Sequence, residues 1–347
     1  MNNPLTHDLN HILTYTESLW AELRNQRIFI TGGTGFFGCW FLESFVWASD
    51  RLDLNSTAII LTRSADTFRK RVPHLVSHPA IQFHEGDVRD FEFPEDSFTY
   101  IIHAATSASA QLNEQNPLLM FDTIVGGTRH VLDFARHCGA KKFLFTSSGA
   151  VYGKQPSEIT NVSEDYAGAV NPVDPRSAYG EGKRAAELLC SLYSEQYGLE
   201  VKIARCFTFV GPYLPLDIHY AIANFIRDGL KGGPIYVKGD GKPCRSYLYA
   251  ADLSIWLWTI LFKGISCRPY NVGSGQEITI GELAKIVAHQ FNNKPQIQIL
   301  QRPKENQTPD RYVPSVQRAE VELGLKQFIG LPDAIRKTVS WNRSLTY

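Results

Sequence analysis

The chain has 347 residues, of which 44% are hydrophobic and 20% charged, the composition of an ordinary globular protein with a sizeable core. Lysine plus arginine and aspartate plus glutamate both number 35, so the formal net charge is zero, which argues against a nucleic-acid partner and a basic membrane-binding surface. The six cysteines form no CxxC pair and no zinc spacing, so the sequence predicts no metal site and a reducing, cytoplasmic location.

Residues 8–25 have the apolar spacing of an amphipathic helix, expected on the outside of a sheet. The first twenty residues lack the basic and apolar regions of a signal peptide. The longest apolar run, 253–262, is too short for a membrane span and reads as a buried helix. Between these segments strands and helices alternate: strands at 27–31, 58–62, 81–86, 100–105, 142–148 and 201–207, and helices at 36–49, 122–139 and 178–198.

Repeated strand–helix units predict an α/β fold, a Rossmann-type doubly wound parallel sheet with helices on both faces. A polar stretch at 153–177 interrupts the pattern, and a connection of that length is usually functional. We expect an N-terminal helical extension at 1–26 and an NAD(P)-binding domain at 27–208, with sheet elements returning near 244–266. A smaller α/β substrate-binding lobe would occupy most of 209–347.

Three glycines, Gly32, Gly35 and Gly38, lie between the first strand and the helix that follows it, in "ITGGTGFFG". A dinucleotide-binding loop requires this strand–turn–helix context. Gly32 suits a sharp turn, Gly35 a close approach to a pyrophosphate, and Gly38 tight helix–strand packing. The helix N-terminus then attracts the phosphates, so a neutral protein can bind an anion.

The GxxGxxG spacing resembles the extended, nucleotide-sugar-modifying branch of the short-chain dehydrogenase/reductase superfamily, the NAD-dependent epimerases and dehydratases. The resemblance covers residues 27 to about 325. It implies NAD as the cofactor, and Arg63, which follows the second strand in place of an acidic residue, leaves NADP open. "GDVRD" and "HAATSAS" resemble the adenine-contacting and cofactor-lining segments. The implied cofactor residues are Gly32, Gly35, Phe36, Phe37, Gly38, Arg63, Asp87, Val88, Ala104, Ala105, Thr106, Tyr179, Lys183 and Phe207.

Tyr179 and Lys183, in "AYGEGKRAAE", are four residues apart on a helix and so share one face. A phenol is a weak base at neutral pH, and a neighbouring ammonium favours its phenolate form. The phenolate can then take a proton from a sugar hydroxyl while hydride leaves the same carbon. The resemblance to the Ser/Thr–Tyr–Lys triad, with "SSxxVYG", implies Ser148 as the third catalytic residue and Ser147 as the fallback.

The segments at 164–187 and 239–253 resemble UDP-glucuronate decarboxylases most closely. Members of that group have Thr-Ser-Glu before "VYG", and 4,6-dehydratases have Thr-Asp-Glu. This chain has Ser148, Gly149 and Ala150 there, so the acid/base carboxylates are missing unless another, such as Glu181, replaces them. The sequence therefore favours a 4-epimerase of a nucleoside-diphosphate sugar. The alternatives are a decarboxylase, a 4,6-dehydratase or a 4-ketosugar reductase, and a non-catalytic dinucleotide-binding regulator ranks lower because Tyr179 and Lys183 are both present.

The nucleotide diphosphate must anchor while the sugar reacts, so binding energy far from C4 serves the reaction. Arg245 and Arg311 resemble the family's two diphosphate arginines, and Asn224 its nucleotide-side asparagine. Thr208 stands where the family has an asparagine. The implied substrate residues are Ser107, Ser148, Thr208, Asn224, Arg245 and Arg311. The resemblance further implies a homodimer built from the helices at 122–138 and 178–197.

Overall fold

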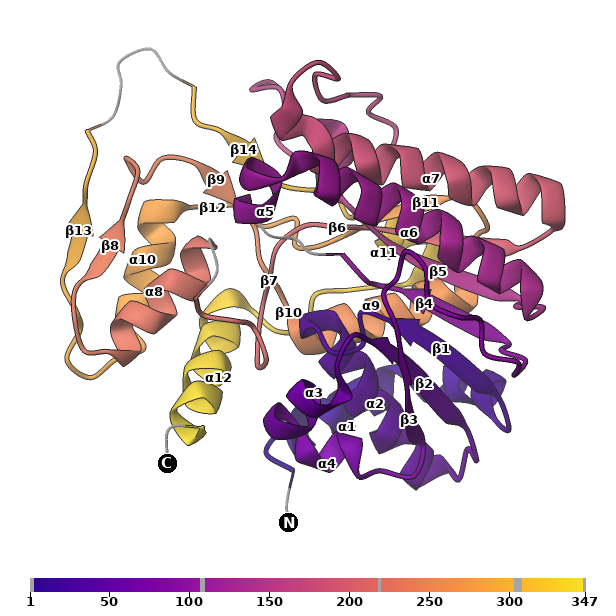
Figure 1. Ribbon diagram of the computed structural model, residues 1–347. Helices are drawn as coiled ribbons and strands as arrows, with labels where there is room; N and C mark the ends of the chain where they lie inside the picture. Colours follow the sequence, from indigo (N-terminus) through magenta and orange to yellow (C-terminus); the bar gives the residue numbers. More distant parts are fainter. Residues whose placement is uncertain (1–2, 107–109, 218–219, 303–307, 346–347) are drawn as a thin grey trace. The chain divides into compact units, whose positions relative to one another are not determined.

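Seven strands form one sheet in the computed structural model, which describes residues 3–106, 110–217, 220–302 and 308–345 (Figure 1). The strand order is β11-β6-β5-β4-β1-β2-β3, and the pairs from β3 through β5 are parallel. The order reverses at β1, which lies between β2 and β4. A doubly wound sheet binds ligands at the carboxyl ends of its strands beside such a reversal. The predicted α/β Rossmann-type fold is therefore confirmed.

The chain divides into two units. Unit 1 comprises Met1–Val151, Val170–Arg205 and Ser254–Tyr270. Its elements are α1 Thr6–Thr16, η1 Glu17–Leu23, β1 Arg27–Thr31, α2 Phe36–Leu52, β2 Thr57–Thr62, α3 Ala65–Arg71, α4 Pro73–Val76, β3 Ile81–Glu85, β4 Tyr100–His103, α5 Ala110–Gln115, α6 Pro117–His137, β5 Lys142–Ser148, η2 Gly149–Tyr152, η3 Pro175–Ser177, α7 Ala178–Tyr197 and β6 Glu200–Cys206, with most of α9 Ala250–Lys263 and the start of β11 Pro269–Val272.

Unit 2 comprises Tyr152–Ala169, Cys206–Leu253 and Asn271–Tyr347. Its elements are β7 Phe209–Val210, α8 Ala221–Leu230, β8 Ile235–Val237, β9 Cys244–Arg245, β10 Leu248–Tyr249, β12 Ile278–Thr279, α10 Ile280–Ala288, β13 Ile297–Ile299, β14 Arg311–Tyr312, α11 Gln317–Leu323 and α12 Leu331–Ser344. Three small sheets, β10–β7, β12–β9–β14 and β13–β8, connect these short strands.

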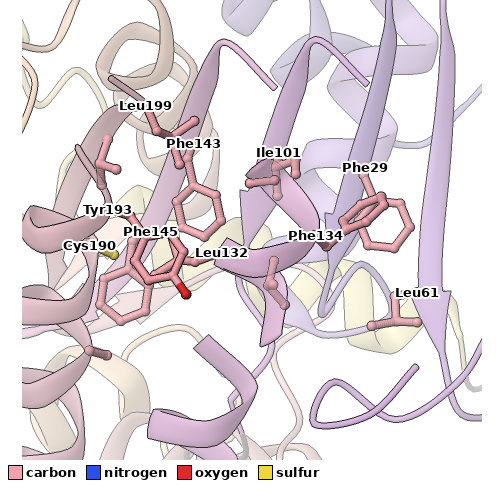
Figure 2. Close-up of a cluster of buried hydrophobic side chains, with 14 of the residues drawn as sticks. Phe29, Leu61, Ile101, Leu132, Phe134, Phe143, Phe145, Cys190, Tyr193 and Leu199 are labelled. Atoms are coloured by element: carbon pink, nitrogen blue, oxygen red, sulfur yellow. The ribbon is translucent and has the colours of Figure 1, made fainter. Parts of the chain in front are cut away.

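Alternate side chains of the central strands point to opposite faces of the sheet, because a strand has a period of two residues. On one face Phe29, Ile101, Phe143 and Phe145 pack against apolar residues of α6 and α7, including Phe134. Figure 2 shows this cluster. On α2, α9 and η1, a second group packs together: the Trp258 ring lies 4.8 Å from Trp20 and 5.2 Å from Phe41, centroid to centroid. Rings of this size supply much of the apolar burial in unit 1.

The single helix predicted at 8–25 is wrong, since α1 ends at Thr16 and a 3₁₀ segment, η1, follows. The buried Thr16 hydroxyl donates to the Ile12 carbonyl at 2.6 Å and accepts the Trp20 indole N–H at 2.9 Å. Such side-chain bonds compete with regular helix geometry. In the part of the chain that the structure describes, none of the helices combines the length and the apolar composition needed to cross a membrane.

Candidate active site

The glycine loop joins β1 to the N-terminus of α2. Gly32 has a left-handed φ of 71°, and a Cβ there would lie 2.5 Å from the Ala104 carbonyl. A Cβ on Gly38 would lie 2.3 Å from the Gly33 carbonyl, so the first turn of α2 packs directly on the loop. These two positions therefore admit only glycine.

Gly35 is the N-cap of α2 and leaves room for a ligand. Among the described residues, a Cβ there would approach one atom within 4 Å, the Gly32 carbonyl oxygen at 3.3 Å. The first turn of a helix presents backbone N–H groups and a partial positive charge to this space. The residues present thus fit a dinucleotide pyrophosphate, which Gly35, Phe36 and Phe37 would hold.

The predicted adenine-side residues lie after β2 and β3. Arg89 donates to the Asp87 carboxylate at 2.8 Å, and this hydrogen bond, with the nearby charge of Arg63, holds the pKa of Asp87 below its usual value. Val88 packs on α6, where a Cβ on Gly127 would lie 3.1 Å from a Val88 methyl. The structure therefore brings Arg63 and Asp87 near each other and fixes Val88 against a helix.

Sequence reasoning missed Arg71, the last residue of α3. Its guanidinium donates to the Thr34 carbonyl in the glycine loop and lies 3.4 Å from the sulfur of Cys39 on α2. Arg71 is exposed, so it places a solvated cation beside the predicted phosphate site. The basic run at 69–71 was the available signal, but exposed basic residues in the last turn of a helix are common.

The segment after β4 is anchored to β1. The Ala104 N–H donates to the Thr31 carbonyl at 3.1 Å, and the Ala105 N–H donates to the Thr31 hydroxyl at 3.2 Å. The Thr106 hydroxyl donates to the Ala105 carbonyl at 2.7 Å. These three predicted cofactor residues therefore form a rigid edge beside Gly32, whereas the predicted substrate residue Ser107 lies outside the described residues.

His103, the last residue of β4, is buried behind this edge. Its ring nitrogens lie 2.7 Å from the Thr31 hydroxyl and 3.0 Å from the Thr128 hydroxyl on α6. Burial, and then the nearby charge of Lys183, lower the pKa of His103 to about 3. The ring is therefore neutral at physiological pH, so it can accept from one hydroxyl and donate to the other.

Lys183, on α7, is almost completely buried, with a relative exposure of 2%. Its ammonium donates to the Thr106 hydroxyl at 2.8 Å and to the Thr146 carbonyl at 2.7 Å, and it lies 4.8 Å from the Phe145 ring centroid. A buried ammonium needs such partners because desolvation disfavours its charge. The structure thus fixes this charge between the ends of β4 and β5.

Tyr179 lies one turn before Lys183, half-buried and packed against the core cluster. Its backbone N–H donates to the Asn113 side chain at 3.1 Å, which holds the first turn of α7. A Cβ on the next residue, Gly180, would lie 3.0 Å from the Ala150 carbonyl, so α7 begins against the segment that follows β5. Both predicted helical residues therefore lie near the carboxyl end of β5.

Ser147 and Ser148 end β5 and point to opposite faces of the strand. The Ser147 hydroxyl donates to the Glu187 carboxylate at 2.5 Å. The buried Ser148 hydroxyl accepts the Ala150 N–H at 3.2 Å, a local bond that leaves its own proton to donate elsewhere. This difference favours Ser148 over Ser147 as the third member of the proposed triad.

The remaining predicted residues, Phe207, Thr208, Asn224, Arg245 and Arg311, belong to unit 2. The structure brings the two arginines onto neighbouring strands, β9 and β14, where Arg245 is in register with Tyr312. Arg245 pairs with Asp310 at 2.8 Å, and Arg311 pairs with Glu277. The Thr208 hydroxyl donates to the carbonyl of Ser246, the residue after Arg245.

Two other residues of unit 2 lie on different elements. The Phe207 ring, just after β6, lies against the Tyr312 ring in a tilted arrangement, with centroids 4.6 Å apart. Asn224 lies in the first turn of α8. Of the six predicted substrate residues, Arg245 and Arg311 therefore lie on the β9–β14 pair, and Thr208 bonds to the residue that follows β9.

The Thr146–Ser147–Ser148 segment and the Tyr179–Lys183 pair meet near the carboxyl end of β5: α7 carries the phenol and, one turn later, the buried ammonium that donates to the Thr146 carbonyl. In this setting a phenolate can accept a proton while a bound dinucleotide accepts hydride. The chain carries no clustered His, Cys, Asp or Glu side chains that could hold a metal ion within the described residues.

Comparisons with known proteins agree with this arrangement. Residues 28–273 match the model of the family described as "NAD dependent epimerase/dehydratase family". UDP-glucuronic acid decarboxylase 1 of Danio rerio is 32% identical over 322 residues, which cover 92% of this chain and 73% of that protein.

Two solved structures are similar over almost the whole fold. DesIV of Streptomyces venezuelae, a dTDP-glucose 4,6-dehydratase with NAD and TYD bound, is 25% identical with a TM-score of 0.76, over 92% of this chain and 97% of that chain. UDP-glucose 4-epimerase of Thermus thermophilus in complex with NAD is 26% identical with a TM-score of 0.75, over 91% and 99%. The predicted superfamily and the predicted cofactor NAD are thereby confirmed. The chain is an enzyme that belongs to the NAD-dependent epimerase/dehydratase family.

Proposed function

We propose that the enzyme uses bound NAD to oxidise C4 of a uridine-diphosphate sugar, and that its reaction is the decarboxylation of UDP-glucuronate. The observation that supports this reaction is the similarity to UDP-glucuronic acid decarboxylases. Those of Danio rerio and Arabidopsis thaliana are 32–35% identical to this chain over 90–92% of its length. These relatives support the alternative among the sequence predictions better than the favoured 4-epimerase.

The chain's own residues supply proton transfer at O4 of the sugar. The fixed Lys183 ammonium favours the phenolate of Tyr179, which takes the C4 hydroxyl proton, and the Ser148 hydroxyl donates to the same oxygen. NAD, when bound, supplies a reversible acceptor for the hydride of C4.

Oxidation at C4 makes decarboxylation feasible without an acidic residue at the sugar's C6. A 4-keto hexuronate is a β-keto acid, so loss of CO₂ leaves an electron pair that delocalises onto O4. Protonation at C5, with solvent as the proton source, and return of the hydride and the O4 proton to C4 would complete the UDP-pentose. Groups that donate to O4 stabilise that charge as an oxyanion hole does. Tyr179 and Ser148 are such donors, and Gly149 and Ala150 are therefore compatible with decarboxylation.

Incubation with NAD and UDP-glucuronate carrying ¹³C at C6 tests the proposal. We expect ¹³C-bicarbonate and a UDP-pentose, followed by ¹³C NMR and mass spectrometry. A product that retains six carbons and is inverted at C4 would show epimerisation instead. Absence of any conversion of UDP-glucuronate would reject decarboxylation.

A second candidate, 4-epimerisation, is favoured by one specific observation: Ser148 is followed by Gly149 and Ala150, with no carboxylate on that segment. A 4-epimerase needs removal and return of hydride at C4 and nothing at C5 or C6. The measurement is conversion of UDP-glucose to UDP-galactose without net consumption of NADH. Net consumption of a reduced cofactor would indicate a 4-ketosugar reductase.

We propose further that unit 1 binds the cofactor and that Arg245 and Arg311 of unit 2 bind the substrate diphosphate. Both guanidiniums already pair with half-exposed carboxylates, Asp310 and Glu277. A dianionic ligand can replace such partners because solvated pairs are weak.

The homodimer also belongs to the proposal. Leu118 of α6 and Leu188, Leu192 and Tyr197 of α7 are large apolar side chains exposed on the two predicted dimer helices. Light scattering after gel filtration checks this, and a monomeric mass would contradict it. The cytoplasmic location stays a prediction.

A further inference from the structure

Glu187 connects three elements of unit 1 in a largely buried network. It lies on α7, and its carboxylate accepts the Ser147 hydroxyl of β5 at 2.5 Å. Arg205 of β6 donates to both carboxylate oxygens, at 3.0 Å from Nε and 2.7 Å from Nη2. Only 13% of the Glu187 side chain and 14% of the Arg205 side chain are exposed. Bidentate pairs of this kind fix geometry as well as charge.

The same helix contacts β5 at the preceding residue as well. Lys183, one turn before Glu187, donates to the Thr146 carbonyl, while Glu187 accepts from Ser147. Two consecutive residues of β5 therefore hold two consecutive turns of α7. Ser148, the next residue of β5, is the proposed hydroxyl donor to the substrate. Rotation or sliding of α7 would break both contacts and move Tyr179 relative to the carboxyl end of β5.

We propose that Glu187 is a positioning residue that, with Arg205 and Ser147, sets the height and rotation of α7 on β5. It acts through Tyr179 and Lys183. The inference thus rests on the proposed function, which assigns the chemistry to those two residues.

Glu187→Gln removes the negative charge beside the buried Arg205 guanidinium and replaces one acceptor oxygen by an NH₂ donor, so Arg205 and Ser147 compete for the single remaining oxygen. These groups then form hydrogen bonds with other protein groups or with water, and α7 shifts so that those bonds can form. A displacement of about 1 Å at a reacting group can lower a rate by about 100-fold, whereas binding contacts elsewhere are unaffected. The chemical step should therefore suffer more than binding.

Kinetics of Glu187→Gln, Ser147→Ala and the double variant test this, with Glu200→Gln as the matched control. Glu200 pairs with Lys202 at 2.7 Å on the same strand as Arg205, and its carboxylate is half-exposed. We expect Glu187→Gln to lower kcat by about 10- to 100-fold. KM for the sugar nucleotide and the NAD dissociation constant should stay within about twofold.

Non-additivity is the second expected result. Ser147→Ala should lower kcat less than Glu187→Gln, and the double variant should be no worse than Glu187→Gln alone, because both act on one network. The control should keep wild-type kcat. Wild-type kcat in Glu187→Gln, or equal losses in kcat, KM and NAD affinity, would overturn the inference. If Glu187→Gln fails to fold, the milder Ser147→Ala decides, and an unchanged kcat there would also overturn it.

A wrong function assignment can be told apart from a wrong positioning role. If the function is wrong, the wild type converts no sugar nucleotide, and crystal structures of the wild type and Glu187→Gln test the positioning role directly. We then expect the contact from the Lys183 ammonium to the Thr146 carbonyl, 2.7 Å in the wild type, to break in Glu187→Gln. An unchanged contact would contradict the positioning role.

Discussion

Lys183 is almost completely buried, and its ammonium donates to the Thr106 hydroxyl after β4 and to the Thr146 carbonyl of β5. Such a charge acts strongly on neighbouring groups because little water screens it. The proposed function uses this charge, because an ammonium close to a phenol favours its phenolate form.

Replacement of Tyr179 by Phe should therefore lower kcat by at least about 100-fold, the usual range for loss of a positioned acid/base. NAD affinity should change little, since the ring and its packing on the core are kept. Turnover measured by product analysis and NAD titration by fluorescence check the two parts. An undiminished rate would rule out the assigned chemistry.

Protonation of His103 should lower the free energy of unfolding at acidic pH. Its pKa is lowered to about 3 from 6.5, so the folded state prefers the neutral ring. The stabilisation is complete above pH 6.5 and is lost as pH falls toward 3, at about 1.4 kcal/mol per pH unit for an isolated group.

Urea unfolding at pH 7 and pH 5 checks this in the wild type and in His103→Gln. The wild type should lose more unfolding free energy between the two values than the variant, which has no titrating ring. His74, which pairs with the buried Glu43, has a raised pKa, so its protonation changes the unfolding free energy in the opposite direction. Only the difference between the wild type and the variant therefore gives the contribution of His103. Equal losses would contradict the assignment.

At the residue scale, the sequence could identify residue types but not their directions. Tyr179 and Lys183 follow from helical spacing, and the structure places both at the carboxyl end of β5. Ser147 and Ser148 are adjacent and chemically identical, so only the strand's faces separate them, and Glu187 binds one of the two. Arg71 could not be predicted because it reaches the loop across 37 residues of sequence.

At the scale of elements, the loop between β1 and α2 depends on the absence of side chains. Gly38→Ala would bring a methyl group to 2.3 Å from the Gly33 carbonyl, so α2 must move from the loop. We expect a loss of at least tenfold in NAD affinity and a lower melting temperature. Isothermal titration and calorimetry measure both.

Gly126→Ala is the matched control. Gly126 lies inside α6, is exposed, and a Cβ there meets no described atom within 4 Å. Alanine should stabilise the protein by about 0.5–1 kcal/mol because glycine weakens a helix interior. NAD affinity should stay at the wild-type value. Stabilisation by Gly38→Ala, or destabilisation by Gly126→Ala, would contradict this packing.

The strands at 27–31 and 142–148 have the predicted bounds because apolar runs between turn residues mark buried parallel strands well. The helix predicted at 122–139 instead begins at Pro117, with Asn116 as its cap, since a proline fits a helix's first turn. The break after Thr16 was not predictable, because it depends on the buried contact between Thr16 and Trp20.

At the scale of the molecule, Asp252 is a single buried carboxylate that joins distant parts of unit 2. It accepts the backbone N–H groups of Phe328 and Ile329 at 3.0 and 2.9 Å. Asp252→Ala should destabilise the protein by about 2–4 kcal/mol, since two backbone donors lose a buried, charged acceptor. Denaturant unfolding measures this change. Asp333→Ala, which changes an exposed side chain of α12, is the control and is expected within about 0.5 kcal/mol of wild type. Equal effects of the two substitutions would contradict this role.

Neither unit is continuous in the sequence, and hydrophobic patterning does not reveal which late segments return to an early sheet. Local periodicity predicts a helix at 253–262 but not its packing on α2 and η1, which depends on Trp258 meeting Trp20 and Phe41. The pairing of β11 with β6 at the edge of the sheet likewise joins segments that are far apart in the sequence.

That edge has a consequence for biosynthesis. A nascent chain that has emerged from the ribosome only as far as Cys206 has made β1 to β6, yet it lacks β11 and α9. Its β6 then presents unpaired backbone groups, and one face of the sheet stays uncovered by the later helix. Translation must deliver more than sixty additional residues, through Val272, before the sheet is closed. During that interval the growing polypeptide is exposed to aggregation, and chaperones that shield strand edges have their opportunity to act.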